Sequence, residues 1–248
     1  MNSDIKTIED LSLNAWPSHQ IELYDGWLLR FSYFYTHRTN CVEQIGPSTI
    51  PLEEKIRYCE SAYRRWGTPV IFKISPLLPS FFDTHLEANG YRKEHAVDNM
   101  TLLLPEDFSA PADSAVTLTP TIPNSWIRAL FSLKHTTNPH HRRVVPSMYH
   151  AIPKETICAS ITNGREIIAT GLGILDRDYI GVYAIHVHPD YRRRGYAEDI
   201  CRSILAKGQE KGATHAYLQT EQGNEAAHHL YHKLGFTENY ACWFRCKA

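Results

Sequence analysis

The sequence predicts an α/β protein built from two consecutive units in which helices flank short strands. Segments with apolar residues at helical spacing alternate with short runs of β-branched and aromatic residues. A helix-strand-helix order occurs twice, and residues 86–94 parallel residues 231–238. Residues 106–114 combine proline, alanine, serine and acidic residues, which is typical of a linker. We therefore expect one unit over residues 1–105, a linker over 106–114 and a second unit over 115–248.

Hydrophobic periodicity and turn residues define the expected elements of the first half. Helices are expected where apolar residues recur three and four positions apart and a glycine or proline follows, as Gly67 follows the second helix. The third helix should turn Phe81, Phe82, His85 and Leu86 inward. In order, the expected elements are a helix over 5–15, strands over 21–23, 27–35 and 39–45, a helix over 52–66, a strand over 70–74, a helix over 80–89 and a strand over 92–104.

The second half shows the same kinds of pattern. Asn163-Gly164 predicts a tight hairpin between two of its strands. The polar stretch 134–149, rich in histidine and arginine, is interpreted as a surface loop that could carry specificity. In order, the expected elements are a strand over 116–118, a helix over 125–133, strands over 156–162, 166–175 and 180–187, a helix after Gly195, a strand over 216–220, a helix after Asn224 and a hairpin or bent strand over 237–247.

Residues 182–206 predict a strand, a basic glycine turn and a helix. The strand ends at Pro189, which cannot continue a ladder of hydrogen bonds. Beyond Gly195 the apolar positions follow the spacing of an amphipathic helix. The first N–H groups of that helix lack intrahelical partners and lie at the positive end of its dipole, so the turn is suited to bind an anion such as a diphosphate.

This turn resembles the pyrophosphate loop of the GCN5-related N-acetyltransferase (GNAT) family, which binds acetyl-coenzyme A. The turn reads Arg192-x-x-Gly195-x-Ala197 where the family has (Gln/Arg)-x-x-Gly-x-(Gly/Ala). A second match follows the next strand, Asn224-x-x-Ala227-x-x-x-Tyr231-x-x-Leu234-Gly235-Phe236. The resemblance implies a mixed, mostly antiparallel central sheet flanked by helices. The first half then looks like a degenerate GNAT unit, because Gly46 to Pro51 stand where the turn would be, and we expect it not to bind coenzyme A.

The resemblance also implies where acetyl-CoA binds. Two strands should splay apart and leave a gap for the thioester, and backbone groups of one strand should pair with the pantetheine arm. The turn should hold the diphosphate, and Asn224 should cap its helix and contact the pantetheine arm. The residues expected to bind the cofactor are Ile185, His186, Val187, Arg192, Arg193, Arg194, Gly195, Tyr196, Ala197, Asn224, Ala227 and Tyr231.

For catalysis, the resemblance gives Tyr231 the role of the acid that protonates the departing thiolate. A phenol has a pKa near ~10 and stays protonated at neutral pH, which suits this role. The helical spacing of Tyr231 also fits a core aromatic residue, and the two roles are compatible. The general base is open between Glu221, His186 and a water relay to the backbone.

No metal site is expected, although two histidine pairs have suitable spacing. His228 and His232 lie four apart on one helical face, and His186 and His188 lie two apart on one strand face. No His-Glu-x-x-His motif occurs, and acetyl transfer needs no Lewis acid. With 14 histidines in the chain, such pairs are expected by chance.

The composition excludes some classes of function. Twenty-six basic and 27 acidic side chains give a formal net charge of −1, so no global basic field attracts nucleic acid or an anionic membrane. No apolar run approaches the ~20 residues that span a bilayer, and the start lacks a signal sequence. The six cysteines show no Cys-x-x-Cys spacing, as expected for buried free thiols in a reducing compartment. We expect a cytoplasmic monomer or homodimer.

Two functions remain after these exclusions. The favoured one is an acetyl-CoA-dependent N-acetyltransferase that acts on a primary amine of a small molecule, peptide or protein. The other is a non-catalytic acyl-CoA sensor or scaffold whose first half binds a partner. The presence of Tyr231 favours the enzyme, since a protein that only binds the cofactor needs no proton donor.

Overall fold

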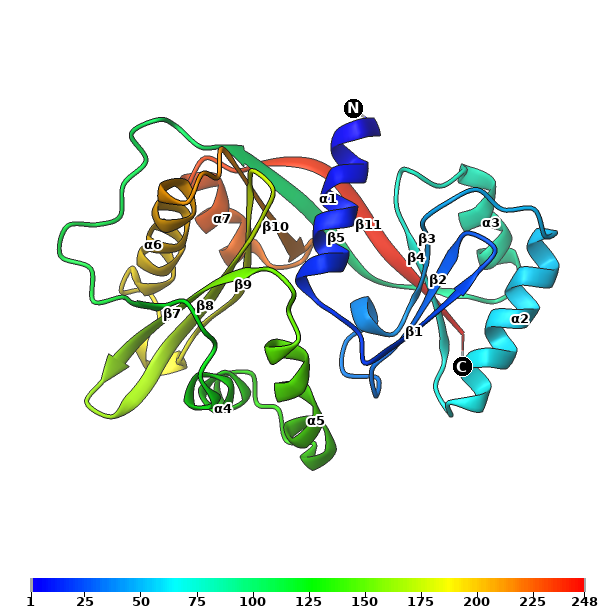
Figure 1. Cartoon of the computed structure of the whole chain (residues 1–248), viewed down its shortest axis with the longest axis horizontal. Coiled ribbons are helices and arrows are strands. Elements are labelled where there is room, and N and C mark those ends of the chain that lie inside the picture. Colours follow the sequence, from blue (N-terminus) through cyan, green and yellow to red (C-terminus); the bar gives the residue numbers. More distant parts are fainter. Residues whose placement is uncertain (1, 248) are drawn as a thin grey trace.

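A single sheet of 11 strands runs through both halves of the computed structural model, which describes residues 2–247. The strand order is β1-β2-β3-β4-β11-β5-β10-β9-β8-β7-β6. All neighbouring pairs are antiparallel except β3 with β4 and β9 with β10, so the expected mixed, mostly antiparallel sheet is confirmed. Figure 1 shows α2 and α3 beside the strands of the first half, α4 to α7 around those of the second, and α1 between them.

The elements follow one another as helices and strands of ordinary length. The helices are α1 (Asn2–Ala15), α2 (Leu52–Arg65), α3 (Ser80–Ala88), α4 (Asn124–Leu133), α5 (Pro139–His150), α6 (Tyr196–Glu210) and α7 (Glu225–Lys233). The strands are β1 (Gln20–Tyr24), β2 (Trp27–Phe31), β3 (Val42–Gln44), β4 (Val70–Ile74), β5 (Arg92–Leu103), β6 (Thr117–Thr119), β7 (Glu155–Asn163), β8 (Glu166–Asp176), β9 (Tyr179–Val187), β10 (His215–Glu221) and β11 (Thr237–Lys247). Two short 3₁₀ helices, η1 (His37–Thr39) and η2 (Pro189–Tyr191), complete the elements of the described residues.

Three sequence-based expectations about these elements are wrong. The stretch 134–149 is not a loop, because Asn138 caps α5 by accepting hydrogen bonds from the N–H groups of His140 and His141. The expected strands over 27–35 and 39–45 shorten to β2 and β3, because η1 takes up the chain between them. Phe81 is 61% exposed rather than inward, while Phe82 and Leu86 are buried as expected.

Two long strands, β5 and β11, connect the halves. β11 pairs with β4 on one edge and with β5 on the other. β5 comes from the first half of the chain, yet it also pairs with β10 over seven residues. Figure 1 shows both strands crossing the middle of the molecule beneath α1. The sheet is therefore continuous across the expected linker boundary, and the division of the chain into two units stays a prediction.

Helix α6 lies unusually close to the sheet of the second half. A Cβ atom on Gly171 of β8 would come within 2.3 Å of the Ile200 side chain, and one on Gly173 within 2.6 Å of Ile204. Both glycines are therefore needed for the close approach of helix and strand. This contact fixes the position of the turn that precedes α6.

A buried ionic cluster joins α1, the first-half strands and β11. The Lys73 ammonium lies 2.7 Å from Glu9 and 3.4 Å from Glu43, and Arg30 lies 3.2 Å from Glu43. The Tyr240 hydroxyl donates a hydrogen bond of 2.6 Å to Glu9. Burial opposes ionisation of Glu43, but Lys73 and Arg30 outweigh it and lower the pKa of that carboxyl. The four charges are thus mutually compensated inside the protein.

Removing one member of this cluster should cost more than removing a surface charge. In Lys73→Met the carboxylates of Glu9 and Glu43 lose a shared buried cation, so we expect a loss of about 3–5 kcal/mol in the free energy of unfolding. The control is Lys6→Met, whose exposed pair with Asp10 should contribute less than ~1 kcal/mol. Urea denaturation at pH 7 measures both. Equal losses in the two variants would contradict the role of the cluster.

Candidate active site

A gap opens in the sheet where the parallel strands β9 and β10 stop pairing. Their register runs from Tyr179 opposite His215 to Val182 opposite Leu218 and ends there. β9 continues to Val187 and β10 to Glu221 without further pairs between them. The remaining part of β9 thus has a free edge beside β10, as the predicted splayed strands require.

A bulge in β9 begins this separation. The register with β8 shifts between Thr170 and Leu172, and Ala184 has a φ of 53°, in the left-handed region that L-residues rarely adopt. The Thr170 hydroxyl donates a hydrogen bond of 3.1 Å to the Ala184 carbonyl, which the disrupted ladder leaves without its usual partner. The bulge therefore redirects the last residues of β9.

The basic turn follows β9 directly. Gly195 stands at the N-cap of α6 with a φ of 85°, and no side chain caps the helix. The space around its Cα is open, since a Cβ atom there would have no neighbour within 4 Å. Arg192 is held by a 3.3 Å hydrogen bond from its Nε to the Val187 carbonyl, and Arg194 donates to the Asp190 carbonyl at 3.1 Å. An uncapped helix N-terminus flanked by exposed arginines is suited to bind an anion.

The last residues of β9 point alternately to its two faces. Ile185 and Val187 pack against the apolar core beneath α6 and α7, where the partly buried Tyr196 and Ala227 and the buried Tyr231 also lie. The structure thus brings together five of the predicted cofactor-binding residues in one cluster. His186 faces the other way, into a cavity between the two halves.

Asn224 caps α7, and Tyr231 lies within that helix. The Asn224 side chain accepts a hydrogen bond from the Ala227 N–H at 3.2 Å, so the predicted cap is confirmed. Tyr231 is 8% exposed, and its hydroxyl makes no hydrogen bond within the part of the chain that the structure describes. Burial raises the pKa of Tyr231, so the phenol carries its proton at neutral pH.

The cavity beside His186 has a volume of about 130 Å³ and receives side chains from both halves. Burial, followed by the nearby Lys134 and Arg192, lowers the pKa of His186 to about 4. The imidazole is therefore neutral at pH 7 and a weak base. The lining residues are Ala15, Trp16, Tyr35, Thr36, Arg38, Lys134, Tyr149, Leu172, Ile174, Tyr183, Ala184 and His186.

The charge of this cavity is positive. Arg38 and Lys134 line it, and no aspartate or glutamate is among its lining residues. Arg38 Nη1 donates a 3.0 Å hydrogen bond to Gln219 on β10, so a first-half residue reaches the open end of the gap. The Tyr35 hydroxyl is buried and has no hydrogen-bond partner among the described residues. Sequence reasoning missed Arg38 and Tyr35, because only the fold brings them to β9.

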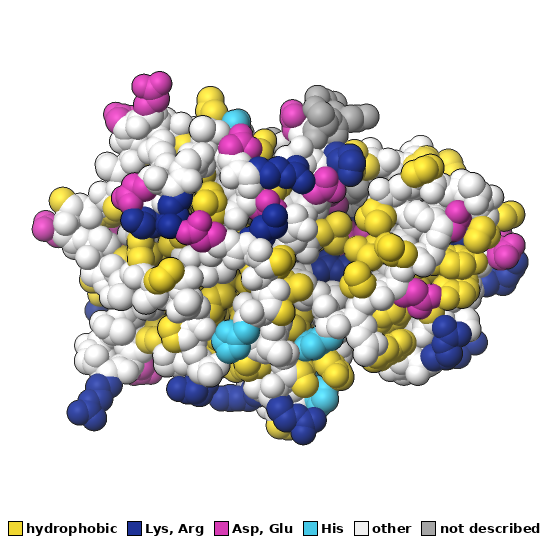
Figure 2. All heavy atoms as spheres, in the orientation of Figure 1, with side chains coloured by type: hydrophobic (Ala, Val, Ile, Leu, Met, Phe, Trp, Pro, Cys, Tyr) yellow, Lys and Arg dark blue, Asp and Glu magenta, His cyan; other side chains and the backbone are white. Residues whose placement is uncertain are grey.

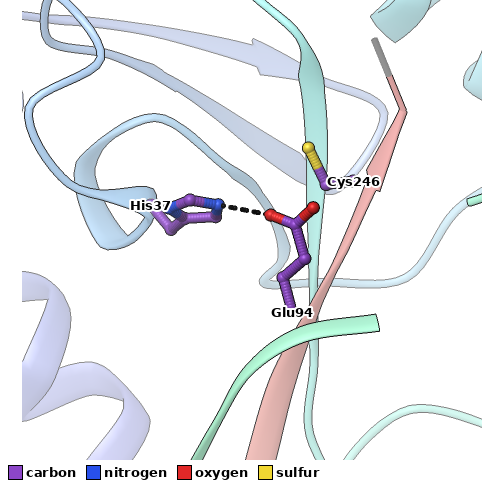
Figure 3. A group of neighbouring side chains, drawn as sticks. All are labelled: His37, Glu94 and Cys246. Carbon is purple, nitrogen blue, oxygen red and sulfur yellow. Dashed lines mark hydrogen bonds and ion pairs between the residues drawn. The ribbon is translucent and has the colours of Figure 1, made fainter. Parts of the chain in front are cut away.

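Glu221, the other candidate base, lies at the end of β10 and leads into a second group of titratable side chains. Its carboxylate is 3.2 Å from His95 Nδ1, and its side chain is 66% exposed. The His95 ring lies 4.5 Å from the ring of His37, measured between centroids. His37 in turn contacts Glu94, with 3.2 Å between His37 Nε2 and the carboxylate, and Figure 3 shows this pair with Cys246 beside it. The structure therefore places Glu221 and His186 in different surroundings.

The surface of the first half differs from that of the second. Figure 2 shows hydrophobic side chains gathered over the first half, and Ile21 and Leu23 of the edge strand β1 are 62% and 68% exposed. All six cysteines are free and buried, as expected from their spacing. Within residues 2–247, no helix is both long enough and apolar enough to cross a bilayer.

Sequence comparisons find related proteins over nearly the whole chain. The model of a protein family described as probable histone acetyltransferase Rv0428c C-terminal matches residues 2–244. A Bacillus subtilis protein named uncharacterized N-acetyltransferase YobR is 26% identical over 237 residues, which cover 94% of this chain and 95% of YobR.

Solved structures show the same fold at low sequence identity. A GCN5-related N-acetyltransferase from Kribbella flavida gives a TM-score of 0.71 at 14% identity. The match covers 98% of this chain and 94% of the Kribbella flavida chain. A tandem GNAT protein from the clavulanic acid biosynthesis pathway gives a TM-score of 0.63 at 12% identity. The match covers 83% of this chain and 74% of that protein. The second match supports an arrangement of two GNAT-like units.

Proposed function

Because this chain belongs to the family of the Rv0428c C-terminal domain and is an N-acetyltransferase of the GNAT fold, we propose that it moves an acetyl group from acetyl-CoA to a primary amine of a small molecule or peptide. The observation that carries this proposal is the gap between β9 and β10, with the basic turn on one side and the cationic cavity on the other. This arrangement suits two substrates that meet at the end of β9.

The cofactor binds through backbone groups in this proposal. Its diphosphate accepts hydrogen bonds from the free N–H groups at the start of α6, with Arg192 to Arg194 supplying positive charge. Its pantetheine arm pairs with the free edge of β9 between Ile185 and Val187, as an added strand would. The thioester then lies in the gap, next to Tyr231.

The reaction follows from this placement. The amine attacks the thioester carbonyl and a C–N bond forms, which gives a tetrahedral oxyanion that a backbone N–H near Val187 stabilises. The C–S bond then breaks, and the Tyr231 hydroxyl gives its proton to the departing thiolate. Burial keeps that proton on the phenol until the thiolate forms, since the pKa of Tyr231 is raised.

The cationic cavity is suited to an acceptor amine that also carries a carboxylate. Arg38 and Lys134 have no acidic partner in the cavity lining, so a carboxylate there would gain two charge-assisted contacts. The same cations lower the pKa of an ammonium group bound beside them and favour the free, nucleophilic amine. Glu221, His186 and a water relay to the backbone remain the candidates to receive the released proton, and the lowered pKa of His186 makes it a weak base.

Placing a negative side chain in the turn should abolish binding of acetyl-CoA. We expect calorimetry to show micromolar affinity in the wild-type chain and a loss of more than 100-fold in Gly195→Glu, because a carboxylate there repels the diphosphate and occupies its place. The control is Gly212→Glu, because Gly212 also has a positive φ and open space but follows the other end of α6. Unchanged affinity in Gly195→Glu would overturn the assignment of the turn.

The acceptor should be selected for its carboxylate. A panel that pairs each amino acid or dipeptide with its neutral amide, assayed by release of free thiol, should show faster turnover of the acids. Arg38→Met should raise KM for the acids by about 10–100-fold, because it removes a charge-assisted hydrogen bond of about 1.5–3 kcal/mol, and should barely change KM for the amides. Arg165→Met, at an exposed turn, should change neither. Equal turnover of the acids and their amides would contradict the proposal that the cavity binds a carboxylate of the acceptor.

Removing the Tyr231 hydroxyl should slow turnover without weakening the fold. Tyr231→Phe keeps the ring and its packing, so acetyl-CoA affinity and stability should barely change while kcat falls about 10²–10⁴-fold. Tyr58→Phe, which deletes a hydroxyl on α2, should keep the wild-type kcat. If Tyr231→Phe acetylated an amine at the wild-type rate with acyl transfer rate-limiting, the tyrosine would be a core residue and not the acid.

A further inference from the structure

We propose that His228, His232 and Glu238 form a zinc site that fastens α7 to β11. The two histidines lie four apart on α7, and Glu238 is the second residue of β11. One ligand atom from each residue lies within 4.8 Å of the others. Two imidazoles and a carboxylate are a donor set that zinc uses in proteins, with a water in the fourth position. This site is independent of the acetyl transfer proposed above.

The distances from Glu238 to the two histidines bracket the spacing of ligands on a tetrahedral ion, and the two histidine nitrogens lie within 4.8 Å of each other. Glu238 Oε1 lies 2.9 Å from His232 Nε2 and 3.7 Å from His228 Nδ1. Ligands at about 2.0–2.1 Å from a tetrahedral zinc ion are roughly 3.3 Å apart, which lies midway between these two distances. Small side-chain adjustments would therefore bring all three atoms to bonding distance from one ion.

The other ring nitrogen of each histidine faces an acceptor oxygen. His232 Nδ1 is 3.2 Å from the Phe236 carbonyl, and because a carbonyl can only accept, Nδ1 carries the proton and Nε2 keeps its lone pair in the neutral ring. His228 Nε2 lies 3.6 Å from Asp98 Oδ2. Asp98 is held in turn by a 2.8 Å hydrogen bond from Gln222 to its other oxygen. Such outer partners orient histidines that ligate metals.

Among the described residues, the contacts of the His228 ring with its neighbours are all longer than a hydrogen bond. His228 Nε2 is buried and has no hydrogen-bond partner among the described residues, and Nδ1 is too far from Glu238 for a hydrogen bond. An ion on His228 Nδ1 would fix the ring proton on Nε2, which faces Asp98, and would bind His232 Nε2 and Glu238 at the same time.

The proposal reverses the expectation, drawn from sequence, that the chain has no metal site. The pair His228 and His232 has a common spacing, but the third ligand and the outer partner come from β11 and β5, which only the fold brings to α7. Zinc here would tie the helix that carries Tyr231 to the strand that joins the two halves.

Zinc titration of the full chain, after removal of metals with a chelator, tests this site. We expect calorimetry with zinc chloride to show one site of micromolar or tighter affinity and a higher melting temperature. His232→Ala and Glu238→Gln should each weaken binding at least 10-fold, and Asp98→Asn, which alters only the outer partner, should weaken it about 10–100-fold. Circular dichroism and acetyl-CoA affinity, measured without zinc, verify that each variant is folded.

His229→Ala is the matched control, because His229 is an exposed neighbour on the same helix and does not belong to the ligand group. It should bind zinc as the wild type does. Equal weakening by His229→Ala and His232→Ala would show diffuse binding by surface histidines and overturn the proposal. So would wild-type zinc affinity in His232→Ala, or the absence of any site in the wild-type chain. None of these outcomes depends on whether the chain turns over an amine.

Discussion

The left-handed backbone at Ala184 is the local constraint on which the candidate site depends. A non-glycine residue in this conformation costs on the order of 1–3 kcal/mol, and the surrounding structure must compensate for it. The Thr170 hydroxyl and the close packing of α6 on β8 hold the strand on either side of the bulge. Beyond it, β9 has a free edge, its last residues alternate between the apolar core and the cavity beside His186, and the turn to α6 begins.

The long strands β5 and β11 impose the second constraint. Because β11 lies between β4 and β5, the first half is attached to the second through a hydrogen-bonded sheet rather than a flexible linker. The buried cluster around Lys73 and the packing of α1 on Tyr217 and Tyr240 strengthen this junction. A rigid junction explains how Arg38 of the first half reaches Gln219 and lines the cavity beside His186. In this arrangement the first half contributes side chains to the cavity beside His186.

Much of the second half could be predicted from sequence, because its signals are local. The strand before Pro189, the turn at Gly195 and the periodic helix after it are each specified by neighbouring residues, and the structure has all three. Asn224 caps its helix through an N–H three residues away, so its role also needs no distant contact. The same locality applies to α5, because its Asn138-Pro139 start is a local signal for a helix, although the polar composition of the stretch favours a loop.

The features of the site that only the tertiary structure decided depend on residues far apart in the chain. Arg38 meets Gln219 across 181 positions, and Asp98 meets His228 from another strand, so no periodicity or motif connects either pair. The opposite surroundings of His186 and Glu221 likewise depend on which segments pack beside each of them. Sequence patterns indicate the spacing of residues along one element, but they do not indicate the order of strands in the sheet. The sequence by itself therefore determined the family, the basic turn before α6 and the candidate acid, while the sheet order decided the cavity, its charge and the side chains gathered around α7.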